Sequence, residues 1–344
     1  MKIDIFSHVV PRKYWDAVVD TVGEAKLKEL GSGDALAVER TRTLWDMDER
    51  FRILDRYPDV KQVISPSGPA LEMIAPPAQA HALARLFNDG IAELVARHPD
   101  RFIAGVAYVC LSNFDEALKE CRRAIEELGL KGVFLHTPIY GRDGVTQPID
   151  IPDLMPLYEM MCKYDLPIWL HPRRAYSVPD YSSENRSKYV LHQMFGWPAE
   201  TTTAMARLVF SGVMERFPAL KIITHHCGGM VPYLAERIVT QSEWYEVGLE
   251  AKFLKKLAQP PIEYFHRFYG DTAINGNKAG LMCGHAFFGA DHLLFGTDMP
   301  YDAELGDKYL RVTIDSVEQM EIPEHEKAMI FEGNARRLLR LNNA

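Results

Sequence analysis

The sequence lacks the features by which membrane proteins, disulfide-bonded proteins and nucleic-acid-binding proteins are usually recognised. No apolar run in its 344 residues approaches the ~18 that a membrane span requires, so we expect no membrane association. The five cysteines are an odd number, are scattered and form no C-x-x-C pair, which indicates reduced thiols in a cytoplasmic protein. The net charge is −8 and there is no basic run, which argues against binding to nucleic acid. Met1 and Lys2 lead directly into an apolar strand, so no signal peptide is expected.

Also absent is a G-x-G-x-x-G turn after the first apolar run, which counts against a dinucleotide-binding fold. The chain instead alternates short apolar strands with amphipathic helices. The eight expected strands are Lys2–His8, Lys61–Ser65, Phe102–Val109, Gly132–His136, Leu166–His171, Lys221–His226, Phe265–Thr272 and His292–Asp298. Strands that are apolar on both faces are typical of buried parallel sheets. Eight such units predict an α/β fold of the (β/α)8 TIM-barrel type, in which the carboxyl ends of the strands face the active site.

Two additions to the barrel are expected. Residues 12–48, after the first strand, are polar and contain helical pieces at Tyr14–Val22 and Glu24–Leu30. This insertion is either a lid over the site or a surface excursion without a role. Two further helices, Leu310–Met320 and Pro323–Leu341, follow the last strand. Residues 1–344 are expected to form a single domain.

Four expected strands end in a residue that can bind a metal ion or transfer a proton. These are His8, His171, His226 and Asp298. A lone histidine at a strand end is usually a structural residue, but a barrel would bring all four residues into one bowl. Imidazole and carboxylate suit Zn²⁺ or a similar divalent ion, and three protein ligands plus water are typical of a catalytic zinc site. The sequence therefore predicts a metal site at the barrel mouth.

Several short motifs occur in an order that is typical of one enzyme family. They are Asp4–Pro11, Leu170–Pro172, Gly196–Thr202, Leu208–Val213, Arg216–Pro218, His226–Pro232, Phe295–Pro300 and Gly333–Ala335. Together they closely resemble the amidohydrolase superfamily, in the branch of 2-amino-3-carboxymuconate-6-semialdehyde decarboxylase and related aromatic-acid decarboxylases. The resemblance extends along most of the chain and implies a TIM barrel with a divalent metal ion.

The resemblance implies roles for individual residues at the strand ends. His8, His171 and Asp298 match the positions of metal ligands. His226 matches the catalytic histidine beside the metal. Its neighbour His225 is expected to point away from the site, toward the barrel wall.

Four arginines are expected near a substrate carboxylate. The resemblance implies that Arg50 holds the carboxylate and that Arg237 reaches into the site of a neighbouring subunit, which suggests a homodimer. Arg173 and Arg174 directly follow the strand that ends at His171. A guanidinium at the mouth would suit bidentate capture of a carboxylate, and the alternative is a solvated loop charge.

Phe6 departs from the family pattern, which usually has histidine or glutamate at this position. Phenylalanine cannot bind a metal, so two interpretations are open. In the first, His8, His171 and Asp298 still give three ligands, and water or substrate completes the shell. In the second, metal binding is weak or lost, and the site works by acid–base chemistry or binds without catalysis.

The activity that the resemblance favours is decarboxylation of a small aromatic or unsaturated carboxylic acid. A divalent metal, Zn²⁺ or alternatively Mn²⁺, would bind substrate oxygens, and Asp298 would relay a proton. The same ligands would also serve a hydrolase or hydratase that uses metal-activated water on an amide, lactone or enoic acid. A metal-poor, non-catalytic binding protein is the third interpretation, because of Phe6.

Overall fold

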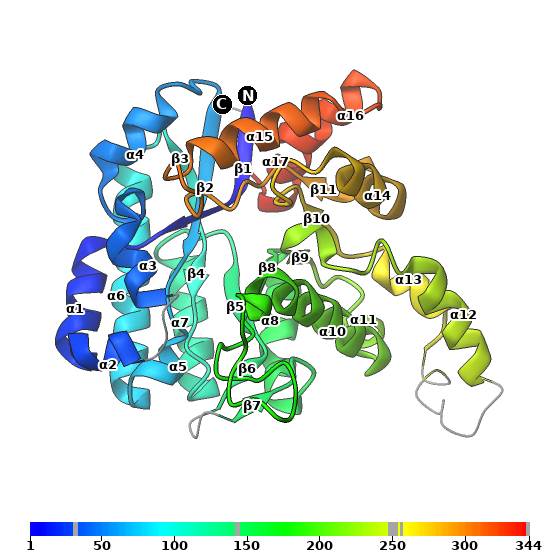
Figure 1. The fold of residues 1–344 in the computed structure, drawn as a ribbon, viewed down its shortest axis with the longest axis horizontal. Helices are drawn as coiled ribbons and strands as arrows, with labels where there is room; N and C mark the ends of the chain where they lie inside the picture. The colour runs from blue at the N-terminus through cyan, green and yellow to red at the C-terminus, as the bar shows by residue number, and fades with distance from the viewer. Residues whose placement is uncertain (30–33, 142–144, 247–253, 255–256, 342–344) are drawn as a thin grey trace.

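Parallel strands joined by helices form the core of the computed structural model, which describes residues 1–29, 34–141, 145–246, 254 and 257–341 (Figure 1). The parallel strands are β1 (Lys2–Val9), β2 (Val60–Pro66), β3 (Phe102–Gly105), β4 (Ala107–Tyr108), β5 (Val133–Thr137), β8 (Ile168–Pro172), β9 (Ile222–Thr224), β10 (Tyr269–Asp271) and β11 (Leu293–Leu294). They pair in the orders β1-β2-β3 and β11-β10-β9-β8-β5-β4. A separate antiparallel hairpin consists of β6 (Ile139–Tyr140) and β7 (Thr146–Gln147).

Backbone hydrogen bonds cross both seams between the two sheets. At one seam, Ile5 N donates to Phe295 O at 2.8 Å. At the other, Val106 N donates to Ile64 O at 3.0 Å, and Val106 is the only residue between β3 and β4. The eight strand positions therefore close into a (β/α)8 barrel, and the predicted fold class is confirmed.

The strands form where the sequence is apolar on both faces, because each strand has the barrel interior on one side and helices on the other. All five residues of β8 are buried, as are the last seven of β1. Inside the barrel, the Trp169 indole Nε1 donates to Ile5 O at 2.9 Å, so the one polar atom of a large buried ring is satisfied. The interior is thus a packed core, and the polar strand ends are displayed only at the mouth.

The helices follow the predicted alternation. They are α1 (Arg12–Val22), α2 (Glu24–Glu29), α3 (Asp34–Arg40), α4 (Met47–Leu54), α5 (Leu71–Ile74), α6 (Pro77–Arg97), α7 (Phe114–Glu126), α8 (Met155–Tyr164), α9 (Leu191–Met194), α10 (Gly196–Phe210), α11 (Val213–Arg216), α12 (Ala235–Glu246), α13 (Pro261–Phe265), α14 (Lys278–Phe288), α15 (Asp307–Glu318), α16 (Glu324–Ala328) and α17 (Asn334–Leu339). One prediction was wrong in detail, since the expected single helix Pro198–Phe217 is broken. Gly212 there has a φ of 85°, a left-handed conformation that ends α10 and begins α11.

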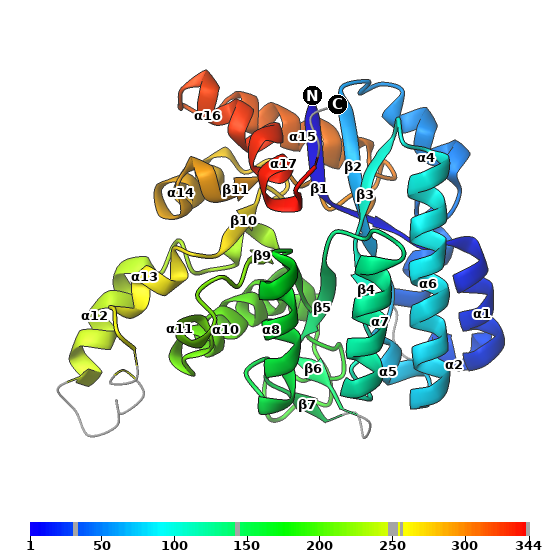
Figure 2. The same ribbon diagram turned by 180° about the vertical axis from the view of Figure 1, so that it is seen from behind.

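The two additions lie at opposite ends of the barrel. The insertion forms α1 to α3, which lie beside α6, whereas α15 to α17 cover the end at which β1 begins (Figures 1 and 2). The predicted helix piece Glu24–Leu30 is present as α2, and Leu30 itself lies outside the described residues. Helices α12 and α13 lie at the outer edge of the molecule in both views. In the part of the chain that the structure describes, no helix is long and apolar enough to span a bilayer.

Candidate active site

The carboxyl ends of four strands bring histidines around one carboxylate. His8 lies near the end of β1 and His171 near the end of β8, while His225 directly follows β9. Asp298 comes four residues after β11. Its Oδ1 lies 3.2 Å from His8 Nε2 and 3.3 Å from His225 Nε2, and its Oδ2 lies 3.9 Å from His226 Nε2. Asp298 therefore lies at the centre of this cluster of side chains.

Three of these histidines are held by their other ring nitrogen. His8 Nδ1 lies 2.6 Å from Pro66 O, and His171 Nδ1 lies 2.8 Å from Pro172 O. His225 Nδ1 lies 2.5 Å from a carboxylate oxygen of Asp271. Each acceptor takes the proton on Nδ1, so Nε2 is the ring nitrogen that can bind a metal ion. The ligand atoms of these three histidines all lie within 4.8 Å of one another, which fits a divalent metal ion.

The placement of His225 corrects a prediction. It was expected to point toward the barrel wall, yet its side chain is fully buried in the site and contacts Asp298. The reason is that β9 already ends at Thr224, so the alternation of side chains along a strand no longer applies. His226 then begins a short 3₁₀ turn with a φ of 54°, which keeps its ring within 3.8 Å of the His225 ring, centroid to centroid. The two neighbouring histidines thus approach the same carboxylate.

Asp271, at the end of β10, is a site residue that the sequence analysis did not identify. Its second carboxylate oxygen accepts the backbone N–H of Cys227 at 3.0 Å and of Ala273 at 3.1 Å. The side chain is fully buried, and all of these bonds fix it behind His225. An acidic residue one position before the expected strand end, Thr272, was the signal available in the sequence.

Phe6 stands among the histidines, fully buried. Its ring stacks on that of His225, with centroids 3.9 Å apart and planes inclined by 16°. The centroids of His8 and His171 lie 5.4 and 5.9 Å from it. Phe6 therefore packs directly against the cluster, at the position where the family pattern has a ligand, and it does not interrupt the approach of the other side chains.

Charge in the site is concentrated on Asp298 and His225. Burial raises the pKa of Asp298, but the charge and hydrogen bond of His225 and the hydrogen bond of His8 outweigh burial and hold that pKa well below its usual value. Burial lowers the pKa of His225, yet Asp271 and Asp298 outweigh burial and raise it to about 9. The pKa of His226 is lowered to about 3, by burial and by the charge on His225. His226 is thus the neutral histidine beside Asp298.

These strand ends open into a cavity of about 190 Å³. Besides His8, His171 and Asp298, its lining includes Phe134, Trp197, Tyr301, Tyr309, His136 and Arg173. Trp197 Nε1 and His136 Nδ1 are buried and have no hydrogen-bond partner among the described residues. Ala37 of α3 also lines the cavity, so the insertion reaches the site. The cavity is mainly aromatic with a few convergent polar groups, which is the usual character of a small-molecule site.

Of the four arginines, the structure places one at the cavity. Arg173 lines it, and its Nη1 donates to Gly68 O at 3.3 Å. Arg174 faces its own loop, with Nη2 2.9 Å from Pro179 O and an ion pair to Asp180. Arg237 is exposed on α12, at the outer edge of the molecule (Figure 1).

Arg50 is fully buried and does not line the cavity. Its guanidinium donates to Gln62 Oε1, His8 O and Thr43 O, each at 2.9 Å, and to Ser7 Oγ at 2.5 Å. These bonds tie α4 to the first two strands beneath the site. The geometry gives Arg50 a structural role in place of the expected contact with a substrate carboxylate.

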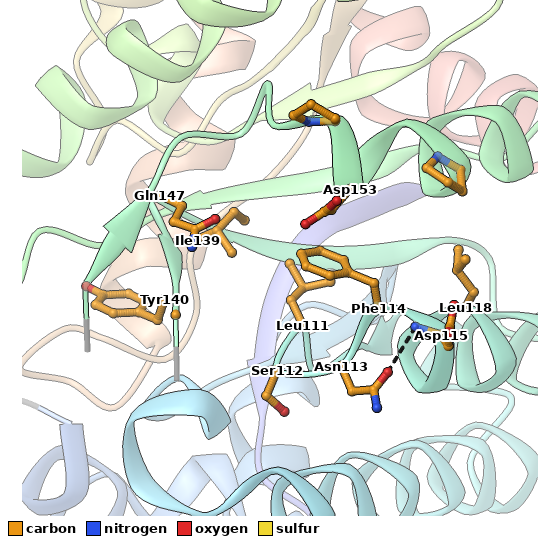
Figure 3. A pocket seen from close by; sticks show the side chains of 13 residues that line it. Leu111, Ser112, Asn113, Phe114, Asp115, Leu118, Ile139, Tyr140, Gln147 and Asp153 are labelled. Atoms are coloured by element: carbon orange, nitrogen blue, oxygen red, sulfur yellow. Dashed lines mark hydrogen bonds between the residues drawn. The ribbon is translucent and has the colours of Figure 1, made fainter. Parts of the chain in front are cut away.

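A larger pocket, of about 780 Å³, lies between the start of α7 and the β6–β7 hairpin (Figure 3). Asn113 Oδ1 there accepts the N–H of Asp115 at 3.1 Å and begins the helix. The described residues around this pocket include no histidine and no arginine or lysine. The larger pocket offers two carboxylates, Asp115 and Asp153, whereas the smaller cavity at the strand ends combines histidines, a carboxylate and an arginine. The smaller cavity is therefore the candidate active site.

Known proteins are similar to this chain along most of its length. The amidohydrolase family model matches residues 3–341. A gamma-resorcylate decarboxylase from a Polaromonas species is 30% identical over 305 residues, which are 88% of this chain and 90% of that protein. The 2-amino-3-carboxymuconate-6-semialdehyde decarboxylase of Dictyostelium discoideum is 29% identical over 356 residues, covering 99% of this chain and 92% of that one. Among solved structures, a dihydroxybenzoic acid decarboxylase from Polaromonas with bound manganese and the inhibitor 2-nitroresorcinol has a TM-score of 0.80 at 28% identity, covering 100% of this chain and 98% of that one.

Proposed function

The chain belongs to the amidohydrolase family, and on that premise we propose that it is a metal-dependent decarboxylase of a small aromatic or unsaturated carboxylic acid. The observation that carries the proposal is the convergence of His8, His171 and Asp298 on an aromatic cavity that also contains Arg173. The relatives that cover most of the chain are decarboxylases, which supports this activity over hydrolysis, hydration or binding alone.

His8, His171 and Asp298 are the residues that would hold the metal ion. The buried Nε2 of His8, which faces Asp298, and the anchored Nδ1 atoms of both histidines fit this role. When bound, the ion would supply a Lewis acid for substrate oxygens. The Polaromonas dihydroxybenzoic acid decarboxylase contains manganese, so we propose Mn²⁺ in place of the zinc that the sequence favoured.

The cavity would select an acid with one ring. Its volume of about 190 Å³ lies below the ~300–1,000 Å³ that is usual for drug-sized ligands, which excludes an extended substrate. Phe134 and Trp197 offer apolar ring faces, while Arg173 offers a cation for a carboxylate. In this pose the ring carbon that carries the carboxylate would face Asp298.

Decarboxylation requires that the C–CO₂ bond breaks, that its electron pair stays on the ring carbon, and that a proton is then delivered to that carbon. Asp298 would relay this proton, and His226, whose Nε2 is 3.9 Å from Asp298 Oδ2, would exchange protons with it. The Phe134 ring, which lines the cavity, would keep water from the reacting carbon.

We further propose a single-domain enzyme in which the insertion, through Ala37, serves as a lid over the cavity. We also propose a homodimer, in which Arg237, an exposed residue of α12, contacts the second subunit. Arg174, which pairs with Asp180, would order the loop at the mouth and would not contact substrate directly. The composition supports a cytoplasmic location.

The test is a screen of hydroxybenzoates and short unsaturated acids with the Mn²⁺-loaded protein in H₂¹⁸O and, separately, in D₂O. We expect release of CO₂, one deuterium at the carbon that lost it, and no ¹⁸O in the organic product. Incorporation of ¹⁸O into that product without CO₂ release would show hydrolysis or hydration instead. No turnover of any acid by protein with a full complement of metal would refute catalysis on this class.

A further inference from the structure

Strand β1 supplies one ligand, His8, where the family pattern has two, because Phe6 occupies the second position. We propose that His225 replaces the missing ligand and completes a set of four residues. The set is His8, His171, His225 and Asp298. This inference rests on the proposed function only in requiring that a divalent ion binds at the site.

The three histidines of the set share one arrangement. In each, Nδ1 lies within 2.8 Å of an oxygen atom that accepts its proton, so Nε2 is the ring nitrogen that is directed at the site and can bind an ion. The Nε2 atoms of His8 and His225 are both buried, and both face Asp298 Oδ1, at 3.2 and 3.3 Å. Their ligand atoms and that of His171 lie within 4.8 Å of one another. Histidines that bind metal ions are almost always held in this way.

The neighbouring histidine lacks this arrangement. His226 Nδ1 is buried without a partner among the described residues, so no oxygen fixes its tautomer. Its Nε2 is 3.9 Å from Asp298, longer than the 3.3 Å of His225 Nε2. The geometry therefore separates the pair into a ligand, His225, and a histidine that is available for proton transfer, His226.

Two buried side chains fix the His225 ring. Asp271 accepts from Nδ1 at 2.5 Å, and its other oxygen is itself held by two backbone N–H groups. A carboxylate in this position orients an imidazole and makes it a stronger ligand. Phe6 stacks on the ring face at 3.9 Å. Phe6 thus removes one ligand from β1 and packs against His225, the residue that replaces that ligand.

The experiment measures Mn²⁺ affinity without substrate. Chelator-treated protein is titrated with Mn²⁺, and free ion is followed by electron paramagnetic resonance for the wild type, His225→Ala, Asp271→Asn and, as the matched control, His226→Ala. We expect Kd to rise by about 10–100-fold for Asp271→Asn and by more than about 100-fold for His225→Ala, because loss of a ligand exceeds loss of its support. His226→Ala should bind as the wild type does. Equal affinity of His225→Ala and the wild type would overturn the proposal.

A second measurement needs no variant, should His225→Ala fail to fold. Spin-echo spectra of Mn²⁺-loaded wild-type protein with ¹⁵N-labelled histidine count the bound imidazoles, and we expect three. Two bound imidazoles would overturn the proposal. Release of CO₂ is assayed separately. If metal affinity depends on His225 and no acid is decarboxylated, the proposed function fails and this inference stands. If an acid is decarboxylated and metal affinity does not depend on His225, the proposed function stands and this inference fails.

Discussion

Arg50 provides the sharpest test of how the structure divides structural from catalytic arginines. We expect Arg50→Met to destabilise the fold and to leave substrate binding unchanged. The substitution keeps much of the side-chain volume but removes four hydrogen bonds inside the protein. The buried acceptors that remain include His8 O and Ser7 Oγ, which flank the metal site on β1.

The magnitude can be worked out from the four bonds. Each buried acceptor that loses its donor costs about 1–3 kcal/mol. Relaxation of the surrounding structure and the remaining backbone hydrogen bonds recover part of this cost, so we expect a loss of about 4 kcal/mol in the free energy of unfolding. At about 2 °C per kcal/mol, the lower end of the scaling for domains of 150–250 residues, Tm should fall by roughly 8 °C. The charge of Arg50 also lowers the pKa of the buried Asp4 carboxyl, so losing that charge makes the ionised carboxylate less stable and adds to the cost.

The assay compares thermal unfolding at one scan rate with steady-state kinetics below the transition. Arg52→Met is the matched control, because Arg52 lies on the same helix, is largely exposed and makes only a surface ion pair with Glu49. Such a pair is worth ~0–1 kcal/mol, so Tm of the control should hardly move. An unchanged Tm for Arg50→Met, together with a KM raised about tenfold (1.4 kcal/mol), would refute the reasoning and return Arg50 to the substrate site.

Three further predictions concern the cavity. Asp298→Asn should lower kcat by about 10²–10⁴-fold with the far-ultraviolet circular dichroism unchanged, because a proton relay is lost; near-normal single-turnover release of CO₂ would contradict this. Arg173→Met should raise KM by about 10–150-fold, the value of a charged hydrogen bond of ~1.5–3 kcal/mol, whereas Arg174→Met should leave KM unchanged. Ala37→Trp should raise KM without changing Tm, because Ala37 lines the cavity on an otherwise peripheral helix; wild-type KM would argue against the lid.

The barrel could be predicted from the sequence because its strands are buried on both faces and therefore read as continuous apolar runs. The run that ends at His171 illustrates this, since all five residues of β8 are buried and the histidine lies near the strand end. The boundaries of the later strands were harder to predict. The expected strand His292–Asp298 is only Leu293–Leu294 by its hydrogen-bond pattern, although Phe295 O still accepts from β1.

The site was predictable where a residue ends a regular strand, and it was not predictable where the chain leaves the strand. Periodicity places His8 and His171 correctly, because their backbones are extended. It misplaces His225, because the positive φ of His226 turns the chain two residues after the end of β9, and no pattern in the sequence reports that torsion. The burial of Arg50 was equally invisible, since its partners are mainly backbone carbonyls from distant segments.

Phe6, which departs from the family pattern, and the adjacent histidines His225 and His226 have one explanation. A site that loses a ligand on β1 must gain a donor elsewhere or bind its ion weakly. The chain has a second histidine after β9, a carboxylate on β10 that aligns it, and the ring of Phe6 that packs its face. Each would be costly alone, because a buried imidazole or carboxylate without a partner destabilises the fold. Together they satisfy one another and direct His225 Nε2 at Asp298, where the other side chains of the site converge.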